Sequence, residues 1–117
     1  MSTTSPSSDR WTPKLEGIQA VLELIQLFAS SDNKKQHEAY VRQEKLQSND
    51  DFAAYCARVF IEESKNVELR QSAGLMMKRC LQQKMAELPD PVIRACQEML
   101  LKGVGDNDEA IRRTAST

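Results

Sequence analysis

A pattern of apolar residues and arginine repeats within this chain with a period of about 40 residues. Leu69-Arg70-x-x-Ala73 is followed 42 positions later by Ile111-Arg112-x-x-Ala115, and Phe52-x-x-x-Cys56 is followed 40 positions later by Val92-x-x-x-Cys96. Periods of roughly 40–47 residues are typical of two-helix units that stack side by side. The repeat therefore favours a solenoid over a closed helical bundle, which the short connections between helices would also allow.

Helices are the only elements that the spacing of apolar residues predicts. Phe52, Tyr55, Cys56, Val59 and Phe60 lie at the i, i+3, i+4, i+7, i+8 spacing of one helical face. Similar stripes predict helices over about residues 14–30, 34–46 and 67–88, a fifth from residue 91 to about 102, and a sixth that begins near residue 108. The sequence thus predicts an all-α fold of antiparallel helix pairs.

Length and charge exclude several classes of protein. The chain has 117 residues with a net charge of −1, which gives one modest domain without the basic surface that nucleic acid or an anionic membrane requires. Its longest apolar-rich stretch, residues 18–29, contains Gln19, Glu23 and Gln26 and is too short to span a bilayer. We expect neither nucleic-acid nor membrane binding.

The N-terminus and the cysteines indicate the cellular compartment. Residues 1–10 are rich in Ser and Thr and lack the pattern of a signal peptide, so we expect a disordered tail. Cys56, Cys80 and Cys96 cannot all pair within the chain, and each lies among helix-forming residues. Both features suit the cytosol or the nucleus.

Residue types that carry catalysis or hold metals are sparse. The chain has one histidine, His37, and it has no glycine-rich phosphate loop and no carboxylate pair at a signature spacing. The three cysteines are 24 and 16 positions apart, whereas zinc ligands usually come in close pairs. The sequence predicts no enzyme activity, no metal and no cofactor.

Several short motifs resemble a known family through their order and spacing. They are Trp11-x-Pro13, Gly17, Asp51-Phe52-x-x-Tyr55, Arg70…Gly74-Leu75-x-x-Lys78, Leu88-Pro89 and Val104-Gly105-Asp106…Ile111-Arg112. Over about residues 11–117 the chain is similar to the N-terminus of the karyopherin-beta (importin-beta) family of nuclear import receptors, in particular its transportin branch. None of these motifs is specific when taken alone.

The resemblance implies an α-α superhelix of HEAT repeats, of which this chain would hold about two and a half. The repeats would cover residues 11–47, 50–88 and 90–117, the third being incomplete. In each pair the first (A) helix would lie on the outer surface and the second (B) helix on the inner surface. Such receptors shuttle between cytoplasm and nucleus, and their cargo and nucleoporins would bind only parts of the receptor outside this chain.

The resemblance also implies a partner, the GTP-bound form of the small GTPase Ran, on the inner faces of the first B helices. The matching positions are Gln36, Gln43, Lys78, Arg79 and Gln82. The chain departs from the family at Lys35 and Gln43, where apolar residues are usual, at Tyr40, where an acid is common, and at Arg79, which replaces an asparagine. The alternative is a HEAT-type scaffold of another pathway without a GTPase partner.

Other residues are assigned to the repeat itself. Arg70 and Arg112, at the starts of B helices, are expected to bond aspartate or carbonyl groups of the neighbouring repeat, and Gly74 and Asp106 are further repeat positions. An incomplete third repeat would leave an open C-terminal edge, at which the chain could self-associate. The apolar residues expected at that edge are Val92, Cys96, Met99, Leu100, Ile111 and Ala115.

Overall fold

The computed structural model describes residues 11–116, and these residues form helices and no strands. The elements are α1 (Leu15–Ala29), α2 (Asn33–Gln47), α3 (Phe52–Phe60), α4 (Val67–Lys84), the short 3-10 helix η2 (Met85–Glu87), α5 (Asp90–Val104) and α6 (Glu109–Ser116). The all-α prediction is confirmed. The predicted tail over residues 1–10 lies outside the described residues.

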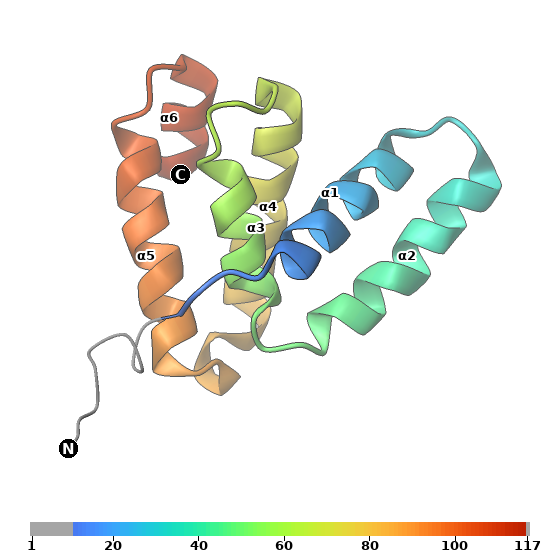
Figure 1. The fold of residues 1–117 in the computed structure, drawn as a ribbon, viewed down its shortest axis with the longest axis horizontal. Coiled ribbons are helices and arrows are strands. Elements are labelled where there is room, and N and C mark those ends of the chain that lie inside the picture. The colour runs from blue at the N-terminus through green and yellow to red at the C-terminus, as the bar shows by residue number, and fades with distance from the viewer. Residues whose placement is uncertain (1–10, 117) are drawn as a thin grey trace.

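The helices form three antiparallel pairs that stack side by side. α3 and α5 lie next to each other and run in the same direction, and α4 packs against α6 behind them (Figure 1). α1, α3 and α5 are thus the A helices, and α2, α4 and α6 are the B helices. The α1–α2 pair leans away from the rest, and α2 hardly contacts α4. This is the stacked arrangement that the repeat predicts.

Short polar side chains begin the B helices. The side chain of Asp32 accepts a hydrogen bond from the Lys34 amide, that of Asn66 from the Leu69 amide, and that of Asp108 from the Ala110 amide. Each bond satisfies an amide that has no partner within its own helix. The local sequence therefore determines where the B helices start.

The core is centred on Phe60, the last residue of α3. Its ring is fully buried and lies against Gly74 of α4 and Gly103 of α5. A Cβ atom at either glycine would lie 2.7 Å from a ring carbon of Phe60. Gly74, a predicted repeat position, is therefore where α4 approaches α3 closely enough to exclude a side chain.

The composition of the C-terminal edge differs from the prediction. Val92, Cys96, Met99 and Ile111 are buried, and Leu100 and Ala115 are partly buried. They are covered to this extent because α5 packs against α3, and α6 packs against α4 and α5. The expectation that all six are uncovered is wrong. The large apolar side chains exposed at this end are Leu101 and Val104.

Among the described helices, none combines the length and the apolar character needed to cross a membrane.

Candidate functional site

The fourth residue of each B helix bonds the turn that precedes it. Gln36 of α2 donates through Nε2 to the Ser30 carbonyl oxygen at 2.7 Å, and Arg70 of α4 donates through Nε to the Phe60 carbonyl oxygen at 2.8 Å. Arg112 of α6 donates through Nη1 to the Asp106 carbonyl oxygen at 2.8 Å. The three side chains thus occupy one position of the repeat.

This equivalence changes the interpretation of Gln36. The resemblance assigned Gln36 to the partner surface, but its amide nitrogen donates to the carbonyl of Ser30, the residue that follows α1. The sequence did not reveal that Gln36 is equivalent to Arg70 and Arg112, because glutamine replaces arginine at this position. In addition, Gln36 and Arg70 are only 34 positions apart, so a period of 40–42 residues does not align them.

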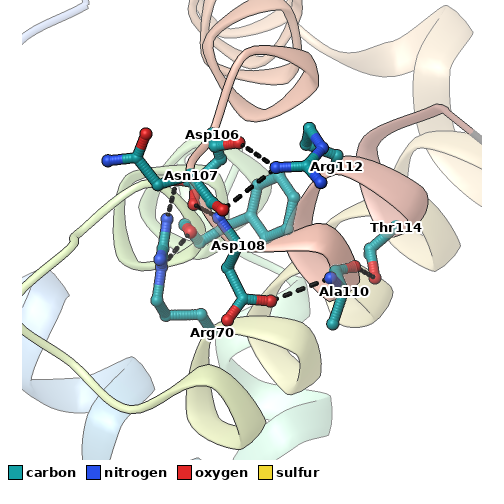
Figure 2. A network of polar contacts seen from close by, with 8 residues as sticks. Arg70, Asp106, Asn107, Asp108, Ala110, Arg112 and Thr114 are labelled. Atoms are coloured by element: carbon teal, nitrogen blue, oxygen red, sulfur yellow. Dashed lines mark hydrogen bonds and ion pairs between the residues drawn. The ribbon is translucent and has the colours of Figure 1, made fainter.

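Arg70 and Asp106, both predicted repeat positions, form a buried ion pair. Nη2 of Arg70 lies 2.5 Å from Oδ2 of Asp106, and the two side chains are 4% and 7% exposed. The other carboxylate oxygen of Asp106 accepts from the Asp108 amide (Figure 2). The hydrogen bond from Arg70 lowers the pKa of the Asp106 carboxyl below its usual range. The pair links α4 to the loop before α6.

Arg112 does not reach a neighbouring repeat. Its Nη1 donates to the carbonyl oxygens of Asp106 and Asn107, in the loop that leads into its own helix (Figure 2). Within residues 11–116, Arg70 bonds Asp106 of the following helix pair, whereas the bonds given for Arg112 stay within its own pair.

Two lysines of α4 bind the C-terminal ends of the adjacent B helices. Nζ of Lys78 donates to the Thr114 carbonyl oxygen in the last turn of α6, and Nζ of Lys84 donates to the Gln47 carbonyl oxygen at the end of α2, at 2.5 Å. Cations are favoured at helix C-termini, where the carbonyl groups lack partners. Burial lowers the pKa of Lys78. Lys78, a predicted partner contact, is thus engaged within the chain.

Gln43 of α2 and Arg79 of α4 both line one groove. The groove lies between α2 and α4 over α1 and has a volume of about 620 Å³. Arg79 is exposed and forms no ion pair with any residue of the described range. Gln82 is exposed farther along α4 and is not among the lining residues. The structure brings two of the five predicted contacts into one site.

Apolar residues of this groove were not predicted as functional. Tyr40 and Leu75, on its opposite walls, are 63% and 58% exposed. The Tyr40 ring stands edge-on to Phe28, with ring centroids 5.1 Å apart. The departure of Tyr40 from the family pattern was the signal that could have identified it.

The structure shows no grouping for metal chemistry. Across residues 11–116 no three side chains of His, Cys, Asp or Glu are arranged to hold a metal ion. Cys56, Cys80 and Cys96 are buried, and burial raises the pKa of each thiol, that of Cys96 to about 12. Protonated, inaccessible thiols are neither nucleophiles nor metal ligands.

Stacked antiparallel pairs joined by a buried Arg–Asp bond define a HEAT-like helical-repeat protein. The family described as "Importin-beta N-terminal domain" matches residues 39–92. Transportin-1 of Oryza sativa subsp. japonica is 28% identical over 92% of this chain, and Transportin-1 of Mus musculus is 27% identical over 89%. Transportin of Dictyostelium discoideum is 22% identical over 89%.

These similarities support a member of the transportin/importin-beta family. It spans about 12% of the length of the curated relatives that it matches.

Proposed function

We propose that this chain is the GTPase-recognising end of a nuclear import receptor and binds Ran in its GTP-bound form through the inner face of its B helices. The observation that carries the proposal is the family match, which runs from α2 into α5 and includes both walls of the groove. The receptor would shuttle between cytoplasm and nucleus, and this part of it would bind without catalysis or cofactor.

The geometry narrows the contacts proposed from the resemblance. Arg79, Gln43 and Gln82 keep polar groups that a partner can reach, and the planar guanidinium of Arg79 suits a carboxylate. Gln36 and Lys78 act on the position of α2 and α6 through their internal hydrogen bonds. We therefore assign direct recognition to the first three residues and positioning to the other two.

The nucleotide dependence has a physical basis. In GTPases the γ-phosphate and Mg²⁺ hold the switch loops in order, so a surface that binds those loops distinguishes GTP from GDP. Interfaces below roughly 1,200 Å² are commonly weak and transient. Because this chain supplies a small part of the receptor, we expect an affinity no better than about micromolar.

The test is a titration of the 117-residue chain with Ran loaded with a GTP analogue or with GDP. We expect binding of the GTP form only, and Arg79→Glu should weaken it several-fold through charge reversal. Arg94→Glu is the matched control, because Arg94 is an exposed arginine on the A helix α5, also without an ion pair in the described part of the chain. Equal binding of both nucleotide states, or equal effects of the two variants, would contradict the proposal.

One set of observations favours the alternative, a HEAT-type scaffold without a GTPase partner. Two of the five contacts implied by the resemblance are occupied within the chain, and Tyr40 makes one wall of the groove more apolar than the family pattern. A folded chain that binds neither form of Ran would support this alternative.

A further inference from the structure

The groove between α2 and α4 is left open by the packing of the chain. α4 packs directly on α6, whereas α2 hardly contacts α4. The bond from Lys84 to the Gln47 carbonyl joins the C-terminal end of α2 to α4, and the α1–α2 pair leans away from there (Figure 1). A volume of about 620 Å³ is within the range of pockets that enclose ligand groups of substantial size.

The lining of the groove is suited to apolar side chains. Ile25 and Phe28 of α1 form its floor, and Leu69 and Met76 of α4 continue it. The Tyr40 ring on the α2 wall is held in position by its edge-on contact with Phe28. Exposed tyrosine and methionine side chains are enriched at protein interfaces.

The charges of the groove lie at its two ends. Two lining residues are charged, Glu68 and Arg79. With Ser72 and Leu75 they follow one stripe of α4, at helical spacings of four, three and four. Eleven residues at 1.5 Å each separate the two charges by about 16 Å. Neither forms an ion pair with another residue of the described range.

We propose that this groove binds an amphipathic α-helix of a protein partner that lies antiparallel to α4. Its apolar residues at i, i+3 or i+4, and i+7 would enter between Tyr40 and Leu75. An acidic residue near its N-terminus would face Arg79, and a basic residue near its C-terminus would face Glu68.

Two conditions, taken together, determine the orientation of the bound helix. Opposite charges attract across the groove, and acids near the N-terminus and bases near the C-terminus stabilise a helix through its dipole. Both conditions are met together only when the bound helix runs antiparallel to α4. The inference deepens the proposed function by naming the kind of segment that the inner face takes, and it rests on that function only in sharing Gln43 and Arg79.

The probe is a pair of synthetic sixteen-residue peptides with a fluorescent label and a hydrocarbon staple on the solvent face. Both carry the same apolar stripe; one has Glu at the N-terminal end and Lys at the C-terminal end, and the other has these charges exchanged. Anisotropy titrations with the 117-residue chain should show about three- to tenfold tighter binding of the first peptide, the effect of two partly exposed ion pairs. The doubly substituted chain Glu68→Lys/Arg79→Glu should prefer the second peptide.

A steric pair of variants tests the location. Ser72 is an exposed residue of the groove, and Ser72→Trp should fill it and weaken binding at least tenfold. Gln97, exposed on α5, gives the matched control Gln97→Trp, which should leave binding unchanged. Circular dichroism checks that every variant is folded.

The inference is overturned if neither peptide binds at millimolar concentration, if the charge-exchanged chain keeps the original preference, or if the two tryptophan variants behave alike. Peptide binding without Ran binding would contradict the proposed function but not this inference. Nucleotide-dependent Ran binding without peptide binding would contradict this inference but not the proposed function.

Discussion

Arg70 of α4 and Asp106 of the α5–α6 loop, 36 positions apart in the sequence, form an ion pair that is almost sealed from solvent. The same guanidinium also donates to the Phe60 carbonyl at the end of α3. One side chain therefore joins the second helix pair to the third and closes the turn within the second. Arg112 repeats the bond to the preceding turn, and Arg70 adds to it an ion pair with the next helix pair.

We predict that Arg70→Ala lowers the free energy of unfolding by about 3–5 kcal/mol, because it leaves the Asp106 carboxylate buried without its partner. Arg79→Ala is the matched control: that arginine is exposed and unpaired among the described residues, so the change should stay within about 0.5 kcal/mol. Urea denaturation followed by circular dichroism measures both. Similar losses for the two variants would mean that the buried pair has no special role.

The same pair predicts an acid sensitivity. The hydrogen bond from Arg70 lowers the pKa of Asp106 below its ordinary value of 3.8, so folding favours the ionised carboxylate. The stabilisation is fully present above pH 3.8 and is lost as the pH falls through the lowered pKa. The free energy of unfolding should decrease over this range and should do so less steeply in Asp106→Asn. Parallel pH profiles of the two proteins would contradict the assignment.

The glycine at the helix crossing gives a third prediction. Gly74→Ala places a Cβ atom 2.7 Å from the fully buried Phe60 ring, which also lies close to Gly103. The change should therefore destabilise the chain by about 1–3 kcal/mol despite alanine's higher helix propensity. At Gly105 the nearest atom to a new Cβ is 3.8 Å away, and the φ angle of −97° suits alanine. Gly105→Ala should therefore be neutral or slightly stabilising. Thermal unfolding of the two variants distinguishes these outcomes.

The helices and their stacking could be predicted from the sequence, because both depend on patterns of residues that are visible in it. The stripe from Phe52 to Phe60 is buried as its spacing requires, and the Asx caps begin the B helices where the polar clusters occur. The direction in which a side chain points was harder to predict from the sequence. Whether Lys78 points to a partner or to the Thr114 carbonyl depends on the distance between α4 and α6, which no spacing in the sequence encodes.

The groove was missed for a similar reason. Its existence depends on the lean of the α1–α2 pair, and the repeat pattern in the sequence does not give the angle between successive pairs. Tyr40 and Leu75 could be assigned to helices from the sequence, but their large exposure follows from that lean.

The buried thiols predict slow chemical modification. Burial raises the pKa of Cys56, Cys80 and Cys96, so little thiolate forms near neutral pH, and the helices block access to all three. We expect a disulfide reagent such as Ellman's reagent to react slowly with the folded chain at pH 8 and to titrate three thiols rapidly in guanidinium chloride. A rapid reaction of any thiol in the folded chain would show that the core opens there.

The exposed apolar side chains of α5 predict self-association at high concentration. Leu101 is 73% exposed, and Val104, three residues farther along the helix, is exposed beside it. Apolar surface of this kind is covered when molecules associate, since burial of apolar area is favourable at about 25 cal/mol per Å². Light scattering should therefore show an average mass that rises with concentration, and Leu101→Glu with Val104→Glu should abolish the rise by placing charges in the contact. Leu15→Glu is the control, because Leu15 is similarly exposed at the start of α1, in another helix pair. A monomer at millimolar concentration, or an equal effect of Leu15→Glu, would remove the α5 edge as the site of association.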